Sequence, residues 1–157
     1  MEKCEALHWG VELLETAEAA ILTTIDGSGF PETRAMLNLR NKKNFSGLQA
    51  FFSEQNENYA VYFTTNASSP KLAQIKVNPA VSAFYCRPDE WRGLMLGGIM
   101  EIVTDPLIKK AMWQEGWEMY YPGGLECPEY TILRLVPQVA KYYHQMNKFI
   151  FELGAVA

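Results

Sequence analysis

The segment Ala20-Ile21-Leu22-Thr23-Thr24-Ile25-Asp26-Gly27-Ser28-Gly29 gives the clearest indication of the fold class. Four of its first six residues are β-branched, which favours an extended strand. The Asp-Gly-Ser-Gly segment that follows is rich in residues that accept a tight turn, and an alternating run resumes over residues 32–39. We therefore predict a β-hairpin near the start of a mainly β chain.

Further strands follow along the chain. We predict them over residues 59–65, 81–87, 92–103, 130–136 and 139–145, where β-branched and aromatic residues gather. Residues 47–52 form either another strand or a loop packed by its aromatic side chains. The paired glycines Gly97 and Gly98 predict a bulge or a close backbone approach within the longest of these strands.

Three helices are expected between the strands. The spacing of Leu7, Val11 and Leu14 predicts an N-terminal helix. Ser69-Pro70 is a favourable start for a second helix, and Asp105-Pro106 opens a third helix of about fifteen residues. Because turns join consecutive strands more often than helices do, we predict an antiparallel barrel with peripheral helices.

Length and composition exclude several classes of protein. The 157 residues predict a single domain, residues 1–157. Its 14 basic and 18 acidic residues give a net charge of −4, which argues against a nucleic-acid partner because nucleic acids need clustered Lys and Arg. The longest apolar run, residues 93–100, is far shorter than the roughly 20 residues of a membrane helix. With no signal-peptide pattern and three widely spaced cysteines, we expect a cytoplasmic protein without disulfides or a membrane partner.

Several catalytic signatures are missing from the sequence. The two histidines, His8 and His144, lie far apart and no His-Glu-x-x-His segment occurs, so we expect no metal site. Neither a Gly-x-Ser-x-Gly nucleophile elbow nor a Walker loop is present. Gly27-Ser28-Gly29 begins like a dinucleotide fingerprint, but Pro31 and Glu32 break the pattern.

One group of residues points to an anion site. Arg34 lies within a predicted strand, Thr65 ends another, and Lys71 follows the helix start at Ser69. A helix N-terminus favours an anion, and a lysine placed there opposes the helix dipole unless an anion binds. Taken alone, Arg34 is compatible with a solvated strand residue and Ser69 with a simple helix cap. Taken together, the residues predict a site for a small phosphorylated ligand.

The order of several segments resembles a known family. Residues 20–36, 61–75, 78–85 and 98–106 are similar to the pyridoxamine 5′-phosphate oxidase-like, FMN-binding split-barrel family, as are Tyr121-Pro-Gly-Gly and Pro128-Glu-Tyr. Within the family, the chain is most similar to the general stress protein 26-like branch. Each segment alone is weakly specific, but the ordered set spans about residues 10–145. The resemblance implies a six-stranded antiparallel split β-barrel with peripheral helices, and a homodimer that binds FMN in the groove between its chains.

The resemblance also assigns residues to the FMN site. Arg34 and Lys71 would bind the phosphate as cations, and Thr65 and Ser69 would bind it through their hydroxyls. Thr64 would lie near the phosphate and the ribitol. The backbone of Ala35, Met36 and Leu37 would run beside the isoalloxazine ring. Pro70 stands where true oxidases often have Arg, so one phosphate contact of the family is missing. The loop of residues 40–58 is expected to shape the mouth of the pocket, and Cys127 is assigned no role.

The implied function is that of an FMN-dependent oxidoreductase acting on an unknown small-molecule substrate or reductant, with NAD(P)H among the candidates. The alternatives are a flavin-binding stress protein without turnover, and a binder of haem or another small ligand on the same barrel. No catalytic residue is identified. Tyr142, Tyr143 and His144 are the best candidates, although strand packing is the commoner role for such residues. The segment from Lys148 onward contains neither Arg nor His, so oxidation of pyridoxamine 5′-phosphate is not expected.

Aromatic residues give an independent reason to expect the homodimer. Trp113 and Trp117 would share one face of the third helix, with Tyr120 and Tyr121 beside them and Trp91 next to a strand. So many large rings exceed what one small core usually holds, although the barrel and the helix together are the simpler host. We therefore predict that part of this aromatic surface is covered by a second copy of the chain.

Overall fold

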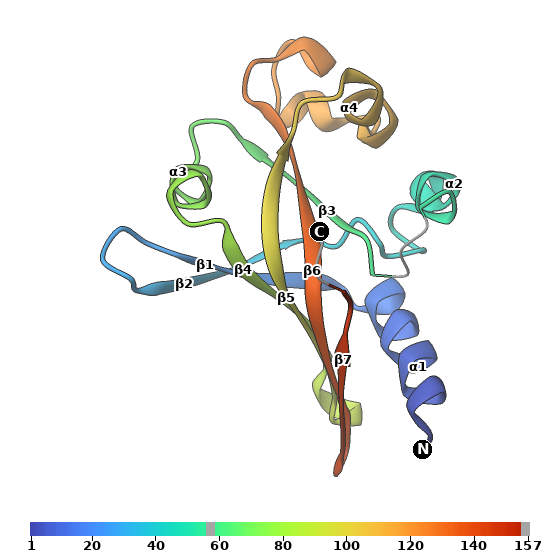
Figure 1. The fold of residues 1–157 in the computed structure, drawn as a ribbon. Helices are drawn as coiled ribbons and strands as arrows, with labels where there is room; N and C mark the ends of the chain where they lie inside the picture. The colour runs from blue at the N-terminus through green and yellow to red at the C-terminus, as the bar shows by residue number, and fades with distance from the viewer. Residues whose placement is uncertain (56–58, 155–157) are drawn as a thin grey trace.

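The computed structural model describes residues 1–55 and 59–154. Its strands are β1 (Ala19–Ile25), β2 (Pro31–Leu37), β3 (Val61–Asn66), β4 (Ala80–Arg87), β5 (Arg92–Val103), β6 (Tyr130–His144) and β7 (Asn147–Glu152). They form one sheet in the order β2-β1-β4-β5-β6-β3, with β7 paired to β6, and every pair is antiparallel. The six-stranded path curls into a half-barrel (Figure 1), which confirms the predicted split barrel. The seventh strand comes from the C-terminal segment, for which no strand was predicted.

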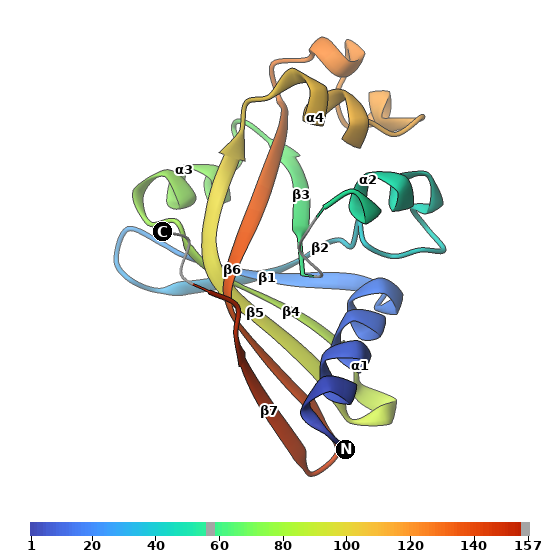
Figure 2. The same cartoon turned by 45° about the vertical axis from the view of Figure 1, so that its right-hand side comes forward.

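Helices surround the sheet. They are α1 (Lys3–Thr16), α2 (Gln49–Ser53), α3 (Pro70–Val77) and α4 (Pro106–Met112), with 3-10 turns at Ser46–Leu48, Pro88–Glu90, Trp117–Met119 and Gly124–Glu126. Figures 1 and 2 both show α3 beside the β1–β2 hairpin, α1 and α2 on the opposite side, and α4 at one end of the long β5–β6 pair. The N-terminal helix, the hairpin and the helix after Ser69 are therefore confirmed.

Two hydrophobic clusters cover the two faces of β3 and β6. The first, here called the barrel core, contains Phe63 and Leu133, together with residues of α1, β1, β4 and β5. The second, here called the outer aromatic cluster, contains Tyr62 and Ile132. Neighbouring residues of a strand point to opposite faces, so each of the two strands contributes to both clusters. This double coverage explains why apolar residues follow one another directly at residues 61–63 of β3 and 132–133 of β6 instead of alternating with polar ones.

The long β6 strand corrects the prediction of two strands separated by Pro137. Its pairing with β5 continues past the proline, with a register shift at Gly97 and Gly98. Gly98 lies opposite Pro137, and a Cβ on Gly98 would lie 2.1 Å from the carbonyl oxygen of Val136. The glycine therefore allows the bulge that keeps the strand continuous, which confirms the predicted close backbone approach.

The predicted length of the third helix is wrong, because the observed helix is shorter. Asp105 does cap it, since its Oδ1 accepts a hydrogen bond from the Leu107 amide at 2.8 Å, but α4 ends at Met112. Trp113 is extended, and Gly116 has a φ of 89°. Trp113 and Trp117 thus do not share a helix face. Their rings still meet edge to face, 6.1 Å apart, because the segment after α4 folds to pack its aromatic residues.

The segment of residues 47–52 is helical, which corrects both readings of it as a strand or a loop. A 3-10 turn leads into α2, and Leu48, Phe51 and Phe52 all pack with the outer aromatic cluster. A strand would send neighbouring Phe51 and Phe52 to opposite faces, whereas a helical turn directs both toward Tyr62, whose ring lies 5.3 and 6.1 Å from theirs. Residues 56–58 of the predicted 40–58 loop lie outside the described residues.

Candidate functional site

Lys71 is the centre of the predicted anion site. Its Nζ donates hydrogen bonds to Ser69 Oγ at 2.7 Å and to Thr65 Oγ1 at 3.0 Å. Ser69 and Pro70 do precede and begin α3, but the Ser69 side chain makes no capping bond. The reading of Ser69 as a simple helix cap is therefore wrong, because its hydroxyl is oriented by the lysine instead.

The charge around Lys71 favours an anion. Both of its acceptors are neutral hydroxyls, and an ammonium group has a third N–H to donate. Burial lowers the pKa of Lys71, and the nearby positive charge of Arg34 lowers it further. Two cations that approach one another in a half-buried place are stabilised when an anion binds between them.

Arg34 is held in place, which corrects its reading as a solvated strand residue. One guanidinium nitrogen donates to Thr24 Oγ1 at 2.7 Å and to the Leu22 carbonyl at 3.3 Å, and the other lies 3.5 Å from a Glu32 carboxylate oxygen. Thr24 in turn donates to Gln74 Oε1 at 2.6 Å. The network joins β2, β1 and α3, so it fixes the guanidinium on the side of the hairpin that faces Lys71.

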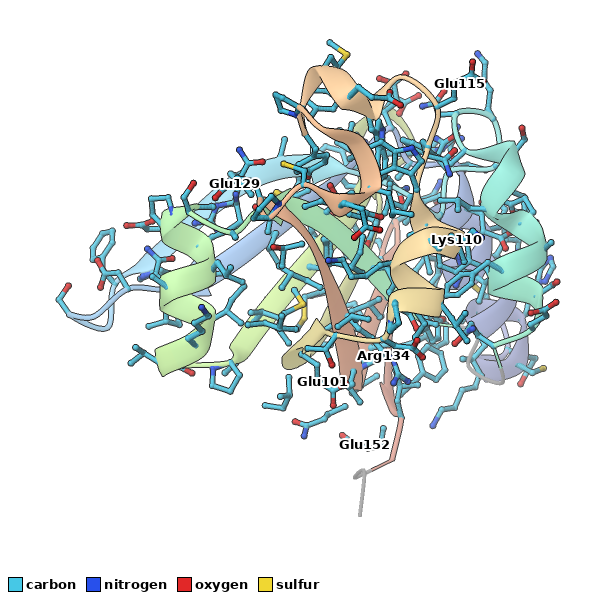
Figure 3. All side chains as sticks on the ribbon, turned by 90° about the horizontal axis from the view of Figure 1, so that it is seen from above. Glu101, Lys110, Glu115, Glu129, Arg134 and Glu152 are labelled. Atoms are coloured by element: carbon cyan, nitrogen blue, oxygen red, sulfur yellow. The ribbon has the colours of Figure 1, made fainter. Side chains whose placement is uncertain are left out.

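The loop between β3 and α3 has an anchor of its own. Glu129, labelled in Figure 3, accepts hydrogen bonds from the Ser68 amide at 3.1 Å and from the Ser68 hydroxyl at 2.7 Å. These bonds lower the pKa of Glu129, so the carboxylate is ionised at neutral pH. Its role is to hold the loop that presents Ser69 and Lys71.

A groove of about 540 Å³ lies next to this anion site. Its lining comes from β2, β3, the start of β1 and the turn after α4: Glu18, Ala19, Ala35, Met36, Leu37, Thr64, Thr65, Asn66, Tyr120 and Tyr121. The volume falls in the usual range for small-ligand sites. The structure thus brings five of the predicted site residues into one groove, and Thr65 joins that groove to Lys71 and Ser69.

Tyr120 and Tyr121 are two of the five groove residues that sequence reasoning did not assign to the site, the others being Glu18, Ala19 and Asn66. Tyr120 is half exposed, whereas Tyr121 is buried and its hydroxyl shares a short hydrogen bond with Thr64 Oγ1. Burial raises the pKa of Tyr121. The sequence offers two signals for them: the segment Tyr121-Pro-Gly-Gly, which resembles the family, and the aromatic residues around Trp113 and Trp117, which predict a dimer surface.

The catalytic candidates at the end of β6 do not line the groove. Tyr142 is buried in the barrel core, and its hydroxyl accepts a hydrogen bond from Arg92 Nε at 3.2 Å. Tyr143 covers Gly93, where a Cβ would lie 2.3 Å from its ring. His144 pairs with Asn147 at the turn into β7. These positions agree with strand packing.

Residues 41–44 of the 40–58 loop line a second hollow of about 730 Å³, together with Cys86 and Arg87. This hollow adjoins the groove, since Glu18 and Ala19 line both. Leu48 and Phe52 pack in the outer aromatic cluster, as does Cys127. Residues 40–55 are not among the residues that line the groove itself, and the expectation that the loop shapes the mouth of the pocket stays a prediction.

Two findings apply to residues 1–55 and 59–154. None of their helices is long and apolar enough to cross a bilayer, and no three side chains of His, Cys, Asp or Glu gather there as metal ligands would.

Comparisons with known proteins agree with the fold. A family model described as pyridoxamine 5′-phosphate oxidase like matches residues 9–157. A Clostridium acetobutylicum protein related to general stress protein 26 of Bacillus subtilis, of the pyridoxinephosphate oxidase family, is 25% identical with a TM-score of 0.76, over 98% of this chain and 97% of that one. General stress protein 26 from Bacillus anthracis is 17% identical with a TM-score of 0.68, over 96% and 100%.

A third similar structure is a haem-binding protein from Mycobacterium smegmatis. It is 11% identical with a TM-score of 0.68, over 94% of this chain and 57% of that one. At this identity the likeness concerns the fold alone. No curated protein sequence matches the chain.

Proposed function

The chain belongs to the pyridoxamine 5′-phosphate oxidase-like family, and from this premise we propose that it binds FMN in the groove between β2 and β3 and acts as an oxidoreductase. The observation that carries the proposal is the position of Lys71. Its ammonium group donates to two neutral hydroxyls and lies close to a second cation, Arg34. Such a group of donors fits a phosphate.

The FMN phosphate would be held by Lys71 and Arg34 as cations and by Thr65 and Ser69 as hydroxyl donors. Bound FMN supplies reversible acceptance of a hydride, while the protein supplies binding and orientation. Pro70 contributes no side-chain donor, so this site relies on fewer cations than sites that carry Arg at that position.

The isoalloxazine ring would lie along the backbone of Ala35, Met36 and Leu37. These residues belong to β2, which is the end strand of the sheet path, so within residues 1–55 and 59–154 one edge of its backbone has no strand paired to it. The amide and carbonyl groups of such an edge can bond the polar rim of a flavin ring. The rest of the lining includes Thr64 and Thr65 of β3 and the aromatic rings of Tyr120 and Tyr121.

We also propose that the active form is a homodimer. Two groove residues are large, apolar and about half exposed, Leu37 at 45% and Tyr120 at 52%, and a second copy of the chain would cover them. The large number of aromatic residues is a weaker reason to expect a homodimer, because Trp117, Tyr121 and Tyr130 are already buried in the outer aromatic cluster of the same chain. Light scattering at micromolar concentration tests the proposal, and a monomer that holds one FMN per chain would contradict it.

The cofactor is tested by an absorbance spectrum of the purified protein after incubation with FMN and with haemin. Flavin bands that stay with the protein after gel filtration support the proposal, whereas a Soret band in their place would support the haem alternative. Reduction of bound flavin by NADH or NADPH distinguishes an oxidoreductase from a flavin-binding stress protein without turnover. The cytoplasmic location and the identity of the small-molecule substrate stay predictions.

Lys71→Ala and Arg34→Ala test the position of the phosphate. Each removes a charge-assisted hydrogen bond, so retention of FMN should fall about tenfold or more. Lys76→Ala is the matched control, because Lys76 is an exposed lysine on the same helix. Retention equal to that of the control in both variants would show that the site is misplaced.

A further inference from the structure

The hydroxyl of Tyr121 meets the groove at one defined point. It shares a short hydrogen bond with Thr64 Oγ1, and both residues line the groove. The Tyr121 ring is 4% exposed and lies 5.1 Å from Tyr130, 6.2 Å from Trp113 and 6.5 Å from Trp117. Aromatic rings therefore hold Tyr121 from several directions, and its hydroxyl has little freedom to move away from Thr64.

Thr64 is also fixed. It lies in β3 opposite Ile132 of β6, within a ladder that runs the length of β3. Its hydroxyl is therefore presented by a paired strand on one side and contacted by a packed phenol on the other. Groups held in this way keep their geometry before a ligand arrives.

The direction of the shared bond follows from the chemistry of the two hydroxyls. A phenol is more acidic than an aliphatic alcohol, so it is the better donor, and the alcohol is the better acceptor. Burial keeps the Tyr121 phenol protonated by raising its pKa, against the opposing effect of the Thr64 bond. With Tyr121 as donor, the one proton of Thr64 Oγ1 is free to point elsewhere.

We propose that Tyr121 is a positioning residue that turns the Thr64 hydroxyl into a donor directed into the groove, where it bonds an oxygen of the ribityl chain. The inference rests on the proposed FMN site. Thr65, the next residue of β3, contacts Lys71 at the phosphate end. Thr64 precedes Thr65 in β3 and lines the same groove as Ala35, Met36 and Leu37 of the proposed ring site. A polyol oxygen is the acceptor that a flavin would present there.

The test compares binding of riboflavin with binding of lumiflavin, which has the same ring system but no ribityl chain. Neither probe carries a phosphate, so Lys71 does not affect the comparison. Tyr121→Phe should weaken riboflavin binding about three- to tenfold, the usual effect of one hydrogen bond, and should leave lumiflavin binding unchanged. Thr64→Val should do the same, and the double variant should lose no more than Thr64→Val alone.

Two further variants distinguish the loss of one hydrogen bond from a change in side-chain packing. Tyr130→Phe removes a hydroxyl from the same aromatic cluster, where it donates to the Lys109 carbonyl at 2.8 Å outside the groove lining. It should leave the binding of both probes unchanged. Thr64→Ser keeps the hydroxyl and should restore most of the riboflavin affinity that Thr64→Val loses.

The outcomes separate this inference from the proposed function. If the unchanged protein binds neither FMN nor riboflavin, both proposals are overturned. If it binds them, and Tyr121→Phe binds riboflavin as tightly as Tyr130→Phe does, only the positioning role is overturned. Equal losses for riboflavin and lumiflavin in Tyr121→Phe would also overturn it, because they would indicate a general loosening of the groove.

Discussion

The barrel core and the outer aromatic cluster are built in different ways. The barrel core is made largely of aliphatic residues on regular strands, such as Leu96 and Leu133, both fully buried. The outer cluster takes several of its rings from the irregular segment after α4 and from the start of β6, and it also contains Phe52 of α2 and Tyr62 of β3. Tyr121 of the outer cluster lines the groove as a buried ring, whereas the barrel core reaches the groove through Met36, a partly buried residue that packs against it. The comparison indicates that the outer cluster fixes part of the groove wall with a buried side chain, while the barrel core contributes to that wall from its edge.

Alanine substitutions of two neighbouring β6 residues should give the largest effects that compare the barrel core with the outer aromatic cluster. Leu133 points into the barrel core and Ile132 into the outer cluster, and both are fully buried. Leu133→Ala and Ile132→Ala should each lower the free energy of unfolding by about 2–5 kcal/mol, measured by urea denaturation. Ile132 lies opposite Thr64, so only Ile132→Ala should also weaken FMN binding. Equal FMN affinities in the two variants would remove the distinction between the clusters.

Two buried tyrosine hydroxyls give a smaller effect. The structure shows no hydrogen-bond partner for Tyr85 in the barrel core within residues 1–55 and 59–154, whereas Tyr130 in the outer cluster donates to Lys109. Removing an unpaired buried hydroxyl relieves a desolvation cost, while removing a paired one leaves its partner unsatisfied. Tyr85→Phe should therefore raise the free energy of unfolding by up to about 1 kcal/mol, and Tyr130→Phe should lower it by about 1 kcal/mol. Thermal unfolding checks the order, and the reverse order would contradict it.

The smallest expected effect is a pH dependence of folding stability that comes from Asp26, in the turn between β1 and β2. Asp26 accepts hydrogen bonds from the Ser28 hydroxyl and from the amides of Phe30 and Ser28, and these lower its pKa below the ordinary 3.8. A lowered pKa in the folded state stabilises the fold above pH 3.8, and this contribution is lost as the pH falls through the folded value. The stability difference between the unchanged protein and Asp26→Asn should thus shrink below that pH. A difference that stays constant down to pH 2 would show that the Asp26 charge does not contribute.

The barrel side was also the more predictable part of the chain. The β1–β2 hairpin and the start of α3 depend on local preferences, namely β-branched runs, turn residues and a proline at the first helical position. The same local preferences predicted that Lys71, Ser69 and Thr65 lie together, because the end of β3 is followed closely by the start of α3.

The outer cluster was less predictable because tertiary packing decides its conformation. The four-residue spacing of Trp113 and Trp117 indicates a helix, yet the chain leaves α4 before Trp113 and turns at Gly116. Tyr121 reaches Thr64 only as a result of that turn, across 57 positions of sequence. No local pattern encodes a contact of this range, so the aromatic side of the groove became visible only in three dimensions.

The proposed function depends above all on Lys71, which would bind the phosphate of FMN. The most direct measurement is the ratio of FMN to riboflavin affinity in the unchanged protein and in Lys71→Ala, since the two ligands differ only in the phosphate. We expect the unchanged protein to prefer FMN by about tenfold or more. Lys71→Ala should lose most of that preference while keeping its affinity for riboflavin. The same ratio in both proteins, or a protein that does not distinguish the two flavins, would contradict the account.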